Sequence, residues 1–234
     1  MNNQLSDIEL YYTLPKNISG NKIKVEGEEY FHIIKVMRHS VDDELYITDG
    51  KGKIYFGRIN KINKNNLELN FEKTLTHENK LKNIFFCIPK LKNSDRLEFA
   101  LEKCTELGIT NFLVFDSERT ISKGNKIERW NKILLSAMKQ SLNSFRPKIE
   151  VTNFKNIFNL TGIKIGLEQS SEKNIQDIKL NLYEKYYFIF GPEGGLSENE
   201  LDYFEKENLY KLAGKRLRTE TAIIATVSLI TLMI

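Results

Sequence analysis

The sequence has few cysteines and no long apolar run. Its 234 residues include two cysteines, four prolines and one tryptophan. Two cysteines in a chain of this length do not make a disulfide framework, so Cys87 and Cys104 are expected to be buried thiols. The longest apolar run, residues 222–234, is too short to cross a bilayer, which predicts a buried helix and no membrane partner. Because the N-terminus also lacks the basic-then-apolar order of a signal peptide, a cytoplasmic protein is expected.

Histidine is scarce as well, and the common cofactor motifs are absent. His32, His39 and His77 all lie in the first third of the chain, so no zinc site or histidine-dependent triad is expected beyond it. No Gly-x-x-x-x-Gly-Lys-Ser/Thr phosphate loop occurs, and the glycines of residues 191–195 do not match the dinucleotide fingerprint. No metal site is predicted. A net charge of +4 is too small to indicate a nucleic-acid partner by itself.

Residues 1–75 show the period-two alternation of β-strands and predict a small barrel. The strands are expected at residues 44–48, 53–59 and 66–71. DGKG at residues 49–52 is a hairpin signal, and one helix is expected over residues 28–39. The polar residues 74–82 are the predicted linker to a second domain.

Residues 83–234 alternate between strands and helices, which predicts an α/β domain with a mostly parallel sheet. The strands are expected at residues 84–88, 112–115, 164–167 and 186–190. The helices are expected at residues 95–107 and 127–142, and from a capping box at Ser197 to about residue 208. A terminal helix is expected from Thr221.

Two turn-rich segments near the C-terminus predict a ligand site. GPEGG at residues 191–195 follows an apolar strand, and LAGKRLRTET spans residues 212–221. Glycine lets the backbone approach a ligand closely, and loops at the carboxyl ends of parallel strands are where α/β sheets bind ligands. A lone Gly-Gly pair would more often be a tight turn without a ligand. The second segment beside it favours a site, with Glu193, Glu220 and Arg218 as its charged groups.

These segments resemble the C-terminal motifs of bacterial small-subunit (16S) ribosomal RNA uridine-N3 methyltransferases, the RsmE type of the knotted SPOUT superfamily. The resemblance is carried by IFGPEGGLS at residues 189–197 and RLRTETA at residues 216–222. KCTELGI at residues 103–109, Ser117-Glu118-Arg119, Gln140-Ser141 with Pro147 and Ile149, and HIIKVMR at residues 32–38 corroborate it. The chain departs from the family at Lys139 and Asn143, where glutamate and arginine are common, and at Ala213, where glycine is expected.

The resemblance implies a knotted SPOUT-type methyltransferase domain over residues 83–234, with a C-terminal trefoil knot, preceded by a PUA-like RNA-binding β-barrel over residues 1–75. It further implies S-adenosylmethionine as cofactor, 16S rRNA of the small ribosomal subunit as partner, and a homodimer paired through the terminal helix. The implied cofactor contacts are Leu167, Phe190, Gly191, Glu193, Gly194, Gly195, Leu212, Leu217, Thr219, Thr221 and Ala222.

For catalysis we expect Arg218 to stabilise the developing uracil anion and Glu193 or Glu220 to act as base or orienter. A structural role for Glu220, in the first turn of the terminal helix, is an equally good interpretation. The RNA contacts expected are Arg38, Arg58, Lys90 and Arg119, with Tyr11, Tyr12 and the Lys51/Lys53 hairpin as further candidates in the barrel.

Two alternatives remain open at this stage. One is a knotted methyltransferase that acts on a different RNA position, such as the ribose 2′-hydroxyl. The other is a non-enzymatic assembly factor that binds ribosomal RNA.

Overall fold

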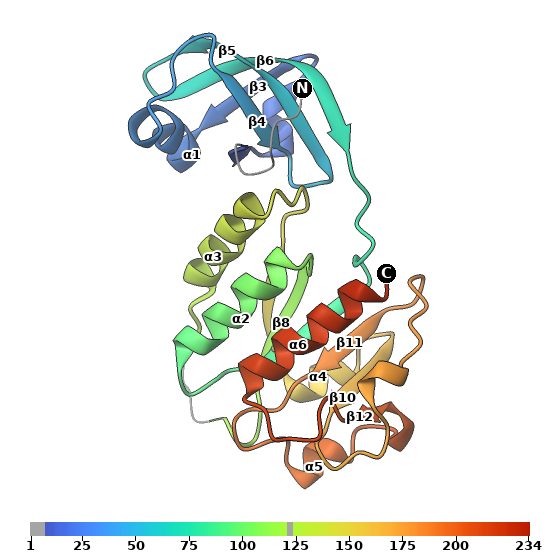
Figure 1. The fold of residues 1–234 in the computed structure, drawn as a ribbon. Coiled ribbons are helices and arrows are strands. Elements are labelled where there is room, and N and C mark those ends of the chain that lie inside the picture. The colour runs from blue at the N-terminus through green and yellow to red at the C-terminus, as the bar shows by residue number, and fades with distance from the viewer. Residues whose placement is uncertain (1–7, 121–123) are drawn as a thin grey trace. The chain divides into compact units, whose positions relative to one another are not determined.

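The computed structural model describes residues 8–120 and 124–234, and its contacts divide the chain into two units (Figure 1). The first unit comprises Met1–Asn79 and Met138–Arg146, and the second comprises Lys80–Ala137 and Pro147–Ile234. The chain therefore leaves the second unit after Ala137, contributes nine residues to the first, and returns at Pro147.

The first unit is built on a six-stranded sheet with the order β1-β4-β5-β6-β3-β2, in which only the β1–β4 pair is parallel. Its strands are β1 (Leu10–Tyr12), β2 (Ile18–Ser19), β3 (Lys22–Glu26), β4 (Glu44–Thr48), β5 (Lys53–Ile62) and β6 (Asn66–Thr76). The three strands expected from the sequence are present, whereas β1 to β3 were not predicted. Strand β6 also runs to Thr76, into the expected linker.

The sheet curls so that its two edges approach each other. Thr13, directly after β1, donates its hydroxyl to the Lys24 carbonyl of β3 at 2.9 Å. Inward side chains such as Ile23, Leu45 and Leu67 are fully buried between the strands. Tyr11 belongs to this core, so its expected role as an RNA contact is wrong: the residue is only 2% exposed.

The helix expected over residues 28–39 is shorter and changes its pitch. Helix α1 spans Gly27–Phe31 and continues as a π-helical turn, His32–Val36. The Met37 amide reaches back five residues to the His32 carbonyl at 3.0 Å. Inserted π-helical turns often mark functional sites.

The nine residues from Met138 to Arg146 explain two departures noted in the sequence. Lys139 forms an ion pair with Glu29 at 2.9 Å, and the Asn143 side chain accepts a hydrogen bond from the Phe145 amide at 3.0 Å. The Arg146 guanidinium donates to the Tyr12 hydroxyl at 2.9 Å and stacks over its ring. Lys139 and Arg146 therefore bind this segment to the rest of the first unit, and Asn143 stabilises a turn within it.

The second unit is built on a fully parallel six-stranded sheet with the order β12-β10-β11-β7-β8-β9, which confirms the predicted α/β class (Figure 1). Its strands are β7 (Ile84–Pro89), β8 (Asn111–Asp116), β9 (Lys148–Asn153), β10 (Ile163–Leu167), β11 (Tyr186–Ile189) and β12 (Leu209–Tyr210). Its helices are α2 (Ser94–Glu106), α3 (Ile127–Gln140, as far as Ala137), α4 (Phe154–Phe158), α5 (Glu198–Leu201) and α6 (Thr219–Leu232).

Both faces of this sheet are covered, which is why its central strands are continuous apolar runs. On one face, strand residues such as Phe86 and Phe188 pack against α2, α3 and α6. On the other, neighbours such as Tyr187 and Ile189 pack against α4 and the segment after α5. Cys87 and Cys104 are buried as predicted, and burial raises the pKa of both thiols, so neither is a ready nucleophile.

Two helix boundaries in this unit differ from expectation. The capping box at Ser197 is present, but α5 ends at Leu201 rather than near residue 208, because Tyr203 and Phe204 turn back onto the aromatic rings of α4. The terminal helix begins at Thr219, one half-turn before the expected start. Strands β9 and β12 and helix α4 were not predicted. Among the described residues, no helix is both long and apolar enough to cross a membrane.

We predict that Gly57→Ala destabilises the first unit. Gly57 lies at a register shift between β5 and β6, and a Cβ atom there would overlap the Asn70 carbonyl and approach the Phe71 Cα to 2.5 Å. Relieving such a backbone clash costs about 3 kcal/mol. Thermal unfolding followed by circular dichroism should show a midpoint several degrees lower. Gly214→Ala, which adds a Cβ where no atom lies within 4 Å, is the matched control. An unchanged midpoint for Gly57→Ala would contradict this prediction.

Candidate functional site

Three neighbouring strands of the parallel sheet end at one pocket. Strands β12, β10 and β11 are adjacent, and their carboxyl ends lead into the loops that line a cavity of about 650 Å³. The lining comes from residues 167–169, 190–195, 212–213 and 216–219, with Ala222 of α6 and Arg96 of α2. The pocket thus occupies the edge of the sheet at which α/β proteins bind ligands.

The loop of residues 191–195 is a tight turn. The Gly195 amide donates to the Pro192 carbonyl at 2.8 Å, and Gly195 has a φ of 73°, a conformation that favours glycine. A Cβ atom on Gly191 would approach the Leu196 amide nitrogen to 2.9 Å. Both glycines are therefore required by the turn itself. That the backbone here also approaches a ligand closely stays a prediction.

Side chains from distant segments hold the carbonyl groups of this loop. Thr219 donates its hydroxyl to the Gly191 carbonyl at 3.0 Å. The Arg216 guanidinium donates to the Glu193 carbonyl at 3.2 Å, and the Arg119 guanidinium to the Gly194 carbonyl at 2.7 Å. The start of α6, the loop before it and the loop after β8 therefore fix the turn together. The Arg119 side chain, expected as an RNA contact, serves this loop in the structure.

A buried carboxylate anchors the far end of the same loop. Glu200 accepts hydrogen bonds from the Ser197 amide at 2.9 Å, the Ser117 hydroxyl at 3.0 Å and the Glu118 amide at 3.0 Å. The first bond belongs to the capping box of α5, and the other two tie that helix to the loop after β8. The loop after β8 therefore contacts this region at two places: Arg119 holds the Gly194 carbonyl, and Ser117 and Glu118 bind Glu200 of α5.

The two carboxylates expected in the site have different surroundings. Glu193 is exposed at the pocket wall, and its carboxylate accepts a hydrogen bond from the Lys92 amide at 3.2 Å. Glu220 lies 3.5 Å from the Nε of Arg96, and its side chain is 12% exposed. Its second oxygen is buried and has no hydrogen-bond partner among the described residues. Glu220 does not line the pocket, whereas its partner Arg96 does.

Arg218 lines the pocket at the residue that precedes α6. Its backbone is extended there, with φ −71° and ψ 153°, and its side chain does not cap the helix. The side chain is exposed and makes no hydrogen bond or ion pair with the described residues. Among the arginines at this pocket, Arg216 is bound to a loop carbonyl and Arg96 faces Glu220, so Arg218 is available to a ligand.

The structure brings most of the expected cofactor contacts together. Those that line the pocket are Leu167, Phe190, Gly191, Glu193, Gly194, Gly195, Leu212, Leu217, Thr219 and Ala222. Thr221 does not line it and is exposed on α6. Sequence reasoning missed Glu168, Gln169 and Arg96. Glu168 and Gln169 directly follow Leu167, the last residue of β10, so a prediction that included the whole loop after this strand would have contained them. Arg96 lies on α2, and no signal in the sequence links it to the pocket.

The remaining RNA contacts expected from the sequence differ in their exposure to solvent. Arg38 is exposed in the first unit, with φ 62°. Arg58 is also exposed and forms an ion pair with Glu44. Lys90, by contrast, is buried in the second unit and its ammonium pairs with Asp116 at 2.9 Å. A buried, paired ammonium does not present a free charge to a phosphate, so Lys90 is left out of the contacts proposed below.

Comparisons with known proteins agree with this architecture. The chain is 26% identical over 222 residues to the ribosomal RNA small subunit methyltransferase E of Rickettsia conorii, with 91% of each chain covered. It is 27% identical over 225 residues to the protein of the same name from Bacillus subtilis, with 88% of each covered. A crystal structure of a ribosomal RNA small subunit methyltransferase E from Neisseria gonorrhoeae, bound to S-adenosylmethionine, matches with a TM-score of 0.85 and 27% identity. The match covers 97% of this chain and 98% of the Neisseria chain.

Family models match both units. The model described as an RNA methyltransferase PUA domain matches residues 25–72, within the first unit. The model described as an RNA methyltransferase domain matches residues 77–231, and so includes all three loops of the pocket. With most of its length covered by that second model, the chain belongs to the RNA methyltransferase family.

Proposed function

We propose that this protein transfers a methyl group from S-adenosylmethionine to N3 of a uridine in the 16S rRNA of the small ribosomal subunit. One observation carries the proposal: the three loops at the carboxyl ends of β12, β10 and β11 form one pocket, and Arg218 stands at its wall with no partner among the described residues. The names of the relatives supply the class of RNA, and the resemblance of the motifs supplies the acceptor atom.

The residues of the pocket fit S-adenosylmethionine. Small-molecule sites are typically concave, of roughly 300–1,000 Å³, and mostly apolar with a few polar groups. Leu167, Phe190, Leu212 and Leu217 give this cavity apolar walls, and the turn of residues 191–195 gives it backbone groups. These side chains would hold the cofactor, and the loop backbone would hold its adenine. When bound, the cofactor supplies a methyl group that its sulfonium already activates.

The protein must then make uridine N3 nucleophilic, and Arg218 is placed to help. Loss of the N3 proton leaves negative charge on the uracil oxygens. A guanidinium held at the pocket wall would stabilise that charge through O2 or O4 without first breaking an ion pair. Groups that are already oriented toward developing charge contribute about 10²–10³ in rate for one donor.

Of the two carboxylates, Glu193 is the better candidate to accept the N3 proton or to orient the base. It lines the pocket, and the Lys92 amide fixes one of its oxygens. Glu220 lies outside the lining and faces Arg96, so we assign it the positioning of that arginine. Both carboxylates therefore stay in the proposed site, with different roles.

The target uridine must leave its stack to reach the pocket, which costs a few kcal/mol unless it is already unpaired. Arg216 and Arg218 are exposed at the pocket and would attract the RNA backbone. Arg38 and Arg58 of the first unit would add contacts outside it. A ribosomal RNA substrate also places the protein in the cytoplasm.

A homodimer and a trefoil knot are part of the proposal. Helix α6 is mostly apolar, and Leu232 and Met233 at its end are 87% and 41% exposed. Phe99 on α2, which packs beside α6, is 48% exposed. An apolar face of this kind would be covered if two copies paired through α2 and α6. The knot would be closed by the same terminal helix.

The proposed reaction predicts a specific product. Small ribosomal subunits from a strain deleted for this gene, incubated with the protein and methyl-labelled S-adenosylmethionine, should yield labelled 3-methyluridine after digestion and mass spectrometry. Labelled 2′-O-methyl nucleosides would instead place the activity on the ribose. No label, together with no cofactor binding by calorimetry, would favour a non-enzymatic RNA-binding factor.

We predict that Arg218→Ala separates catalysis from cofactor binding. Because the Arg218 side chain supports no other part of the described structure, the variant should bind S-adenosylmethionine within about threefold of wild type while kcat falls about 10²–10³-fold. Arg216→Ala is the matched control: it removes the hydrogen bond to the Glu193 carbonyl and should weaken cofactor binding. A wild-type methylation rate for Arg218→Ala would remove this residue from the mechanism.

We predict that Glu200→Ala weakens cofactor binding from outside the pocket. The variant leaves the Ser117 hydroxyl and the Ser197 and Glu118 amides without their acceptor, at a cost of about 1–3 kcal/mol for each group that stays buried. The affinity for S-adenosylmethionine should fall about tenfold, and the unfolding temperature should drop. Glu200→Gln keeps one acceptor oxygen and should lose less on both measurements. Equal affinities for wild type and Glu200→Ala would show that the anchor does not control the loop.

A further inference from the structure

One exposed loop of the first unit is held in a conformation that its residues rarely adopt. Residues 37–43 connect the π-helical turn His32–Val36 to strand β4. Arg38 has a φ of 62° and Asp42 a φ of 74°, both in the left-handed region that side chains other than glycine seldom occupy. Such backbone persists only where surrounding contacts fix it, and it gathers at binding sites.

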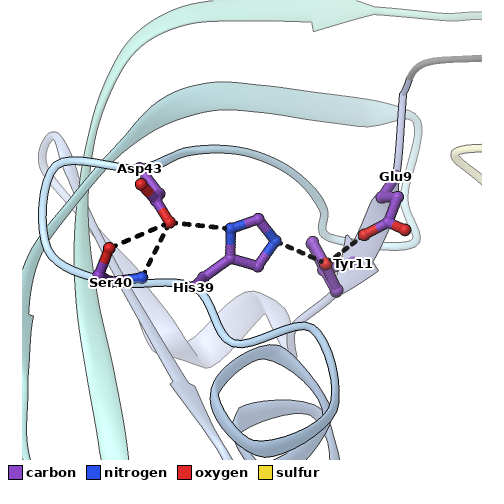
Figure 2. A network of polar contacts seen from close by, with 5 residues as sticks. All are labelled: Glu9, Tyr11, His39, Ser40 and Asp43. Atoms are coloured by element: carbon purple, nitrogen blue, oxygen red, sulfur yellow. Dashed lines mark hydrogen bonds and ion pairs between the residues drawn. The ribbon is translucent and has the colours of Figure 1, made fainter.

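The fixing contacts form a chain of hydrogen bonds that runs from β1 into the loop (Figure 2). The Tyr11 hydroxyl donates to Glu9 at 2.6 Å and lies 3.1 Å from Nε2 of His39. The other ring nitrogen, Nδ1, lies 3.3 Å from the Asp43 carboxylate. The same carboxylate oxygen accepts the Ser40 amide at 2.8 Å. His39 thus connects a buried tyrosine of the sheet to both ends of the turn that follows Arg38.

His39 joins the buried sheet to the loop through both of its ring nitrogens. The Tyr11 hydroxyl donates its proton to the Glu9 carboxylate, and burial followed by the Glu9 contact raises the pKa of Tyr11, so this hydroxyl stays protonated. On the His39 ring, Nε2 lies within hydrogen-bond distance of the Tyr11 oxygen and Nδ1 within hydrogen-bond distance of the Asp43 carboxylate. The substitution His39→Ala would break both contacts at once.

The loop presents groups that suit RNA. Arg38 and Lys35 are exposed, and neither makes a hydrogen bond or ion pair with the described residues. Phe31, at the end of α1, is 59% exposed, and Val36 beside Lys35 is 55% exposed. Free cations for phosphates, next to an exposed aromatic ring for a base, are the combination with which proteins bind unpaired RNA. The segment also lies inside the match to the RNA methyltransferase PUA domain.

We propose that His39 is a positioning residue for RNA binding: it fixes the loop of residues 37–43 so that the Arg38 guanidinium meets an RNA phosphate. The inference rests on the proposed function, because it takes the substrate to be small-subunit ribosomal RNA. His39 itself is mostly covered, with a side chain 23% exposed, and acts through Arg38 rather than by touching the RNA.

A double-mutant cycle tests this dependence. The affinity for in vitro-transcribed small-subunit ribosomal RNA is measured by filter binding at fixed salt for wild type, His39→Ala, Arg38→Ala and the double variant. His39→Ala should weaken binding about five- to tenfold in the wild-type background and less than about twofold in the Arg38→Ala background. In an Arg58→Ala background, which removes a different exposed arginine, the full effect of His39→Ala should persist.

A second variant guards against misfolding. Tyr11→Phe removes only the hydroxyl that joins Glu9 to His39 and keeps the buried ring, so it should reproduce part of the loss, again only when Arg38 is present. Thermal unfolding identifies variants whose first unit keeps its fold. Calorimetric affinity for S-adenosylmethionine, whose pocket lies wholly in the second unit, shows separately that the second unit is intact.

Two results would overturn the inference: a His39→Ala protein that binds RNA as tightly as wild type, or one whose loss is as large in the Arg38→Ala background as in wild type. The proposed function fails in a different way. A wild-type protein that neither binds nor methylates this RNA refutes the proposed function, whereas a wild-type protein that does both, beside an unaffected His39→Ala variant, refutes the role of His39 alone.

Discussion

The buried Glu200 carboxylate accepts three hydrogen bonds, and these bonds determine where the pocket loop of residues 191–195 can lie. A carboxylate taken out of water is costly unless its oxygens are satisfied, so the Ser117 hydroxyl and the Glu118 and Ser197 amides have to converge on it. That convergence brings the loop after β8 beside the start of α5, and Arg119 follows directly. From there its guanidinium reaches the Gly194 carbonyl. The shape of the cofactor loop therefore depends on a residue that never lines the pocket.

The charges around the pocket divide into those that build it and those left for a ligand. Arg119 and Arg216 are bound to loop carbonyls, and Arg96 faces Glu220. Each of these guanidiniums is already paired with a fixed partner. Arg218 has none among the described residues, although only one residue separates it from Arg216. Two arginines of one motif, Arg216 and Arg218, thus have different roles: one holds the loop and the other is available to a ligand. A count of basic residues would not distinguish them.

The parts of the fold that the sequence predicts are those in which local pattern and tertiary environment agree. The strand Tyr186–Ile189 is apolar throughout because both its faces are covered, and the glycines after it mark a real turn. Strand β9 lies at the sheet edge, and its alternation of Ile149 and Val151 with polar residues spans only six positions, too short a pattern to have been recognised. The segment from Met138 to Arg146 joins the first unit through contacts such as Lys139 with Glu29, 110 positions apart, which no local window contains. Arg96 is missed for the same reason, and Lys90 was misjudged because its burial cannot be read from its neighbours.

Each unit contains a turn with left-handed backbone, and different side chains stabilise that backbone in the two units. In the second, glycine supplies the left-handed turn at Gly195, and arginine and threonine side chains hold its carbonyls. In the loop of residues 37–43 of the first unit, Arg38 itself is left-handed, as is Asp42, and the network through His39 and Asp43 offsets the strain. Glycine would relieve that strain but would carry no charge. An arginine here supplies the guanidinium and the backbone direction together, which is what our proposal requires of a residue that meets a phosphate at one fixed place.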